Sequence, residues 1–206
     1  MPTMEDILLA PPEPGVILDL DAIFGPGRCI ELEIGTGKGA FLLSRARAHP
    51  DRGFLGVEWA NKYCRYAADR MARWGVTNVR LMRTDAANLV CHHLPPGRLA
   101  MIHIYHPDPW PKKRHHRRRL IQAPFVAAAV RALVPGGRIA IQTDHAEYFE
   151  HIRAVVQAEP ALAEVPFDVP EAGVIDGRVQ TNFEIKYLRE GRTLYQLAVA
   201  RTPRSG

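Results

Sequence analysis

The chain has 206 residues, of which 47% are apolar and 24% are charged, and its formal net charge is +5. This length suits one domain, residues 1–206, with a sizeable core and leaves little room for a second. The N-terminus MPTMEDILLAPPEPG has no signal-peptide pattern, and we find no apolar run long enough to cross a membrane. Three widely spaced cysteines without a CxxC motif argue against a disulfide framework. These features predict a cytoplasmic protein.

Strand-like apolar runs alternate with helical patterns along the chain. Residues 1–18 precede this alternation, and Pro135-Gly136-Gly137 is predicted to be a turn. In chain order we expect a strand at 28–34, a helix at 40–48, a strand at 53–58, a helix at 61–74, a strand at 78–83, a helix at 86–94, a strand at 99–105, a helix at 118–133, a strand at 138–143, a helix at 146–158, a Pro- and Gly-rich connection at 159–180 with a short strand near Phe167, and a helix and a last strand between 181 and 201. Strands separated by helices predict an α/β fold with a mostly parallel, Rossmann-like sheet and helices on both faces.

Acidic residues stand at or just after the end of each of the first five predicted strands. They are Glu33, Glu58, Asp85, Asp108 and Asp144. Ligands bind at this edge of a parallel sheet. Asp85 and Asp144 could equally cap the helices that follow them, and Asp144 with Glu147 has capping-box spacing. Glu33 lies inside its strand and Asp108 lies between two prolines, so a capping role is less expected for these two. For them a functional role is favoured more strongly than for Asp85 and Asp144.

The turn GTGKGA after the first strand allows two interpretations. Gly35, Gly37 and Ala40 match the dinucleotide fingerprint, with Glu58 where a ribose-binding acid belongs. Gly35, Gly37 and Gly39 equally match the turn over which S-adenosylmethionine lies. Several converging carboxylates suit the sulfonium and ammonium of that methyl donor better than they suit a pyrophosphate. The charge pattern therefore favours the methyl donor.

A basic stretch follows the acidic turn that holds Asp108, in the sequence HPDPWPKKRHHRRRL. The stretch contains six Lys and Arg residues, whereas the net charge of the whole chain is +5. The rest of the chain therefore has no positive excess, and the basic character is local. A concentrated cationic run is typical of a surface that meets a polyanion, although a solvated charged turn has the same composition. We expect Lys112, Lys113 and Arg114 to contact a nucleic acid backbone. The histidines show no metal-ligand spacing, so no metal is expected.

The segment PDPWPKKRHHRRRL, together with ELEIGTGKG, GVEWA, TDHAEYFE and TNFE, closely resembles the tRNA (guanine-N7-)-methyltransferase family from about Asp19 to Leu197. The resemblance implies a class I methyltransferase fold, with a seven-stranded sheet and one antiparallel strand near the end. It also implies transfer of a methyl group from S-adenosylmethionine to N7 of a guanosine in the tRNA variable loop.

The resemblance also assigns roles to residues. It implies that donor contacts come from the carboxylates Glu33, Glu58, Asp85 and Asp108, beside the three glycines. Substrate contacts would come from Lys112, Asp144, Thr181, Asn182, Phe183 and Glu184, the last four of which also match a helix capping box. Asp108 is the candidate catalytic carboxylate, and His106 replaces the apolar or aromatic residue that usually precedes PDPW in the family.

Three alternatives stay open at this point. The chain could methylate a different RNA, act as a nicotinamide-dependent oxidoreductase, or serve as a non-catalytic RNA-binding subunit. The sequence is compatible with a monomer or a homodimer.

Overall fold

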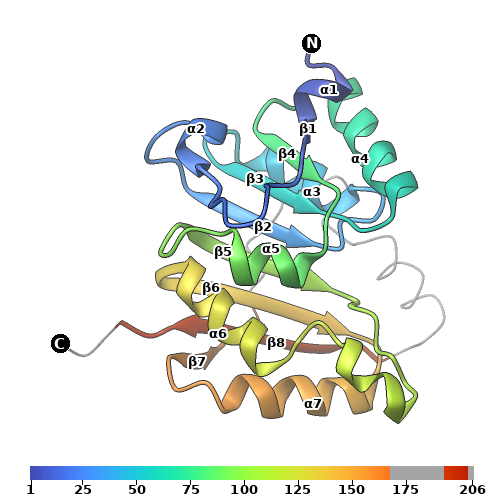
Figure 1. Ribbon diagram of the computed structural model, residues 1–206, viewed down its shortest axis with the longest axis vertical. Helices are drawn as coiled ribbons and strands as arrows, with labels where there is room; N and C mark the ends of the chain where they lie inside the picture. The colour runs from blue at the N-terminus through green and yellow to red at the C-terminus, as the bar shows by residue number, and fades with distance from the viewer. Residues whose placement is uncertain (168–192, 204–206) are drawn as a thin grey trace.

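A computed structural model of the chain describes residues 1–167 and 193–203 and has a twisted sheet at its centre (Figure 1). The strands are β1 (Leu8–Leu9), β2 (Ile30–Ile34), β3 (Gly53–Val57), β4 (Val79–Met82), β5 (Leu99–Tyr105), β6 (Leu133–Thr143), β7 (Leu162–Val165) and β8 (Tyr195–Arg201). The helices are α1 (Met4–Ile7), α2 (Leu20–Phe24), α3 (Ala40–Ala48), α4 (Asn61–Arg73), α5 (Ala86–His92), the 3₁₀ helix η1 (Lys113–Arg118), α6 (Ala123–Ala132) and α7 (Ala146–Gln157). None of the helices in these ranges is long and apolar enough to span a bilayer.

Within the described residues the sheet has eight strands in the order β1-β4-β3-β2-β5-β6-β8-β7. All pairs from β1 to β6 are parallel, and β8 lies antiparallel between β6 and β7. The α/β class and the single antiparallel strand near the end agree with the expectation. The sheet is one strand wider than the seven expected, because Leu8 and Leu9 of the N-terminal segment pair with Leu81 and Met82 at the edge.

Two apolar clusters pack on the two faces of this sheet. One lies between the sheet and helices α1, α3 and α4, and the other between the sheet and helices α2, α5, α6 and α7. Successive residues of a strand point to opposite faces. In β2, Ile30, Leu32 and Ile34 therefore join the second cluster, while Glu31 and Glu33 point toward α3 and α4.

Two local expectations were wrong. The residues Pro135-Gly136-Gly137 lie inside β6 at an irregularity, where the pairing with β5 jumps from Leu133 to Arg138. Helix α6 begins at Ala123 and not at 118, because Pro124 suits the first turn of a helix but would break its interior. The short strand expected near Phe167 corresponds to β7, which ends two residues earlier at Val165 and pairs with β8.

Candidate active site

The candidate site lies at the carboxyl ends of the parallel strands, around the point where the strand order reverses. From β2 the chain adds β3 and β4 on one side and then β5 and β6 on the other. In open α/β sheets this switch point forms the ligand crevice. The predicted acids at the ends of β2 to β6 share this edge of the sheet.

The glycine turn between β2 and α3 has a backbone conformation that glycine adopts more readily than other residues. Gly35, Gly37 and Gly39 have φ angles of 79°, 52° and 70°, in the left-handed region. A Cβ on Gly39 would lie 2.9 Å from the Cβ of Ala67, so this glycine also lets the turn approach α4 closely. The Glu58 carboxylate accepts hydrogen bonds from the N–H groups of Gly37 (2.8 Å) and Ala60 (2.9 Å). Glu58 therefore ties the turn to the end of β3.

Glu33 is buried directly before this turn, with 4% of its surface exposed. Its Oε2 atom has no hydrogen-bond partner among the residues that the structure describes. Burial, with a smaller contribution from the nearby Glu58, raises the pKa of Glu33 to about 8. A buried carboxyl group in this state fits a cationic ligand, because such a ligand would both satisfy the oxygen and favour its ionised form.

Asp85 lies at the end of β4 and takes the helix-capping role that the sequence left open. Its carboxylate accepts a hydrogen bond from the N–H of Asn88 (2.8 Å) at the start of α5, and its side chain is exposed. Capping uses one carboxylate oxygen, so the second oxygen stays able to bind a ligand.

The turn after β5 carries Asp108 and has an unusual backbone. His106 and Trp110, at its two ends, have φ angles of 52° and 42°, which non-glycine residues rarely adopt. Between them, Pro107 and Pro109 restrict the backbone on either side of Asp108, whose side chain is exposed. The turn therefore presents a carboxylate to solvent on a stiff support.

Arg119 holds this turn in place from its buried side. Its guanidinium donates hydrogen bonds to the carbonyl of Pro109 (2.9 Å) and to both oxygens of Glu147 (3.1 and 2.6 Å), and it lies 4.8 Å from the ring centroid of Tyr148. Only 3% of Arg119 is exposed. Arg119 is therefore a structural residue and does not belong to the exposed cationic surface.

The predicted capping box of Asp144 and Glu147 does not form, because α7 begins at Ala146 and Asp144 lies one residue before the capping position. Helix α7 is instead capped by His145, whose Nδ1 accepts a hydrogen bond from the N–H of Tyr148 (3.2 Å). Asp144 lies beside the turn that holds Asp108, since its Oδ1 is 3.7 Å from Nδ1 of His106.

His106 is held by Gln142 through both backbone and side chain. Its N–H donates to the carbonyl of Gln142 (2.7 Å), and its Nε2 lies 3.1 Å from the side-chain Nε2 of the same residue. Gln196 donates to Oε1 of Gln142, which leaves the Gln142 amide to donate to His106. Neutral His106 then carries its proton on Nδ1, toward Asp144. Burial lowers the pKa of His106, although Asp144 opposes this shift. Sequence reasoning noted His106 only as a departure from the family and missed both glutamines.

The remaining cations of the basic stretch are exposed on and around η1. They are Lys112, Lys113, Arg114, Arg117 and Arg118. The guanidinium carbon of Arg118 lies 5.0 Å from the ring centroid of Trp110, and the ring of His115 meets Trp110 edge-on. The cationic surface therefore begins at the turn that carries Asp108. The predicted substrate residues Thr181 to Glu184 lie outside the described residues.

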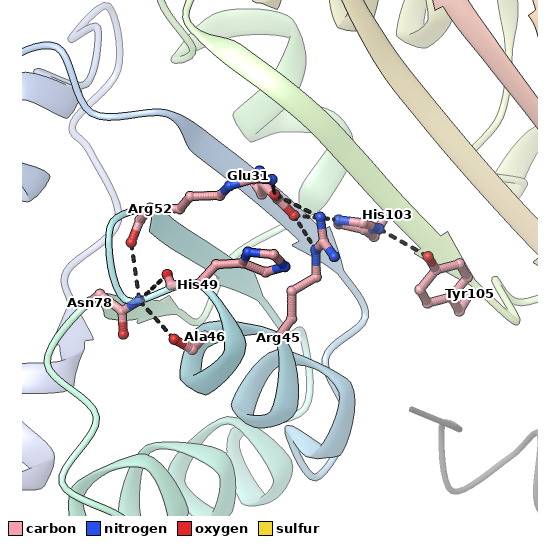
Figure 2. Close-up of polar contacts among 8 residues, drawn as sticks. All are labelled: Glu31, Arg45, Ala46, His49, Arg52, Asn78, His103 and Tyr105. Atoms are coloured by element: carbon pink, nitrogen blue, oxygen red, sulfur yellow. Dashed lines mark hydrogen bonds and ion pairs between the residues drawn. The ribbon is translucent and has the colours of Figure 1, made fainter. Parts of the chain in front are cut away.

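A buried polar network joins β2 to α3 and β5 (Figure 2). The carboxylate of Glu31 accepts hydrogen bonds from Arg45 of α3 (2.8 Å to Nη2, and a second from Nε), from Arg52 (2.7 Å) and from His103 (2.9 Å). The other ring nitrogen of His103 lies 2.9 Å from the hydroxyl of Tyr105. Burial alone would raise the pKa of Glu31, but these partners outweigh it and hold the pKa well below its usual range. No sequence pattern indicated this network, since Glu31 was one residue of a predicted strand.

Comparison with known proteins agrees with this architecture. A family model described as "Putative methyltransferase" matches residues 28–197. The tRNA (guanine-N(7)-)-methyltransferase of Alkalilimnicola ehrlichii is 40% identical over 188 residues, which cover 90% of this chain and 78% of that protein. Among solved structures, the antibiotic-resistance methyltransferase Kmr is 21% identical with a TM-score of 0.60, covering 91% of this chain and 93% of its own. A SAM-dependent O-methyltransferase from Thermotoga maritima is 16% identical with a TM-score of 0.56, covering 91% of this chain and 64% of its own.

The sheet order, the glycine turn and the buried acid at its start define a class I methyltransferase that uses S-adenosylmethionine. Within that class, the chain belongs to the tRNA (guanine-N(7)-)-methyltransferase family.

Proposed function

We propose that this protein transfers the methyl group of S-adenosylmethionine to N7 of a guanosine in the tRNA variable loop, which produces 7-methylguanosine. One observation carries the proposal. A buried acid whose Oε2 has no partner among the described residues lies at the same edge of the sheet as an exposed cationic surface, in a chain that is 40% identical to a relative named for this reaction. We expect the protein in the cytoplasm, because its three cysteines are free thiols and its proposed substrate is tRNA.

The donor pocket would be formed by the glycine turn and the acids around it. Gly35 and Gly37 leave room for the ligand to approach the backbone, Gly39 lets the turn pack against α4, and Glu33, Glu58 and Asp85 supply carboxylates. The bound donor supplies a methyl group on a positively charged sulfur, which makes that carbon electrophilic. The buried Oε2 of Glu33, which lacks a partner among the described residues, is the feature that best fits a cationic group.

Guanine N7 has an in-plane lone pair and loses no proton when it is methylated, so the site needs no general base. Its main task is to hold N7 in line with the methyl group, and such orientation contributes up to ~7–11 kcal/mol in favourable cases. As the methyl group moves, positive charge passes to the purine ring. The carboxylate of Asp108, fixed between two prolines, would stabilise that charge.

The tRNA would be held by the cations that follow Asp108. Lys112, Lys113 and Arg114 would contact backbone phosphates, and Asp144 would contact the substrate beside His106. By resemblance, Thr181, Asn182, Phe183 and Glu184 complete the substrate site. Exposing N7 of a guanosine that is engaged in tertiary pairing costs a few kcal/mol, and phosphate contacts are the natural source of compensation.

The direct test incubates the purified chain with unmodified tRNA and tritiated S-adenosylmethionine, followed by nucleoside analysis. We expect label in 7-methylguanosine and none in other nucleosides. Unmodified ribosomal RNA run in parallel distinguishes a different RNA substrate. Label that appears only in ribosomal RNA, or no label without an added partner protein, would contradict the proposal.

A further inference from the structure

Helix α4 exposes aromatic side chains where a surface helix ordinarily carries polar ones. Its buried side is apolar and faces the sheet through Cys64, Ala67, Ala68 and Met71. On the opposite side, Tyr63 and Tyr66 are 43% and 46% exposed. Residues three apart occupy adjacent positions on a helix surface, so Tyr63 and Tyr66 leave α4 on the same side. Trp59, just before the helix, is 68% exposed.

Exposed cations lie in the same segment as these three rings, which we name the α4 aromatic face (Trp59, Tyr63 and Tyr66). Lys62 and Arg65 are exposed on the same helix. The ammonium of Lys38 lies 5.9 Å from the ring centroid of Tyr66. The nearby acid of the helix, Asp69, is paired with Arg73 (2.8 Å). The local charge is therefore positive, as required for a polyanionic partner.

The α4 aromatic face adjoins the glycine turn of the proposed donor site. Lys38 belongs to the glycine turn, and its carbonyl accepts a hydrogen bond from Arg70 of α4 (3.2 Å). Trp59 directly follows Glu58, the acid that fastens this turn. The cationic surface at η1 follows β5, whereas the α4 aromatic face follows β3, on the other side of β2. Two positively charged surfaces thus lie on either side of the proposed donor pocket.

We propose that the α4 aromatic face is a second RNA-binding surface, on which unpaired bases of the tRNA stack while Lys38, Lys62 and Arg65 contact the adjacent phosphates. Exposed aromatic rings among cations are the combination with which proteins bind single-stranded nucleic acid. The inference rests on the proposed function, because it assigns the same tRNA to both surfaces. A loop nucleotide drawn out for methylation leaves its neighbours unstacked, and this face offers them a new surface.

The test compares tRNA binding by the wild-type chain with three variants, measured by fluorescence anisotropy over a series of salt concentrations. The first variant replaces Trp59, Tyr63 and Tyr66 by alanine. The second replaces Lys62 and Arg65 by glutamine. The third, Trp74→Ala, is a matched control, because Trp74 is 52% exposed at the other end of the same helix beside Arg47.

We expect the aromatic variant to bind tRNA at least about fivefold more weakly with an unchanged salt slope, since stacking releases no counterions. The glutamine variant should show a smaller salt slope. Trp74→Ala should behave as the wild type. A variant that keeps Trp59 as its only tryptophan should lose fluorescence when tRNA is added.

Three results would overturn the inference. The first is unchanged tRNA affinity in the aromatic variant. The second is a loss of tRNA affinity accompanied by an equal loss of S-adenosylmethionine affinity, which would indicate a structural role. The third is a wild-type dimer that becomes monomeric in the aromatic variant, which would assign the face to a second copy of the chain. Methylation of tRNA by the wild type tests the proposed function separately, so the two failures are distinguishable.

Discussion

At the scale of single residues, the site places two carboxyl groups in opposite environments. Glu33 is buried with one oxygen lacking a partner among the described residues, whereas Asp108 is exposed on a turn stiffened by prolines. Burial disfavours the charged form of an acid, and contact with water favours it. The two acids therefore suit different tasks, the first in donor binding and the second in stabilising charge during transfer.

Glu33 should couple donor binding to proton release. Because the pKa of Glu33 in the folded chain is raised from 4.5 to about 8, this group favours the folded state most at low pH and loses that contribution as pH rises through this range. A bound cation favours the ionised form, so S-adenosylmethionine should bind more tightly as pH rises toward about 8. Calorimetry at about pH 7 in buffers of different ionisation enthalpy should detect a released proton. Glu33→Gln should abolish that release, and a variant that still releases the proton would exclude Glu33 as its source.

Asp108→Ala should remove most of the turnover while leaving the fold intact, because the side chain is exposed and its prolines remain. Loss of an electrostatic stabiliser typically lowers kcat by about 10²–10³-fold. Single-turnover methylation of tRNA measures the effect, and circular dichroism verifies the fold. A near-normal rate would refute the catalytic role of Asp108.

At the scale of elements, the stretch from 112 to 119 combines two functions. Its exposed residues form a cationic surface around η1, and its last residue, Arg119, fastens the turn of Asp108 to α7. In the sequence all six cations of this stretch looked equivalent. In the structure Arg119 is buried, whereas the other five are exposed.

Charge reversal of Lys112, Lys113 and Arg114 should lower the salt slope of tRNA binding. Removing one phosphate-bound cation reduces the slope by about 0.7–0.9, because fewer counterions are released. Binding isotherms at several salt concentrations give the slope. Arg98→Glu, at the amino end of β5 and so at the opposite edge of the sheet, is the control, since Arg98 is already paired with Asp21. An unchanged slope in the triple variant would remove the phosphate contacts from the proposal.

Arg119→Ala should act on stability and leave the salt slope unchanged. The loss of a charged donor to the Pro109 carbonyl costs about 1–3 kcal/mol in the free energy of unfolding. Urea denaturation gives this difference, and Arg118→Ala, at an exposed position, should be nearly neutral for stability. A normal stability together with a smaller salt slope would show that Arg119 contacts RNA.

At the scale of the whole molecule, the buried network of Glu31 joins the centre of the sheet to α3. It connects Arg45 of α3 with His103 and Tyr105 of β5, and the ring of Phe41 packs edge-on against both His103 and Tyr105. Helix α3, which follows the glycine turn, is therefore held to β2 and β5 by polar contacts as well as by apolar packing.

Arg45→Leu should destabilise the chain by about 3–5 kcal/mol, because it breaks a buried ion pair and leaves Glu31 with fewer partners. Since the pKa of Glu31 is lowered on folding, its stabilising contribution is present above its usual range and is lost as pH falls. Urea denaturation at neutral and acidic pH measures both effects. Arg73→Ala, which breaks an exposed pair, should change stability by at most about 1 kcal/mol. Equal effects of the two substitutions would contradict a special role for the buried network.

Features that depend on residues close together in the chain could be predicted before the structure was known. Periodicity predicted β5 at its observed bounds and α3 over its whole length, and the resemblance of PDPWPKKRHH led to the family to which the chain belongs. The alternation of strands and helices was sufficient to place the acids at one edge of a parallel sheet. These signals are local, so they can be read without knowing which segments meet.

Which polar groups are buried and paired became known only from the folded chain. Glu31 meets Arg45 and His103 from 14 and 72 positions away, and Arg119 meets Glu147 from 28 positions away. The edge strand β1 likewise exists because Leu8 and Leu9 find β4. No local pattern encodes such partners, because the energy of a buried charge depends on the groups that the fold brings around it.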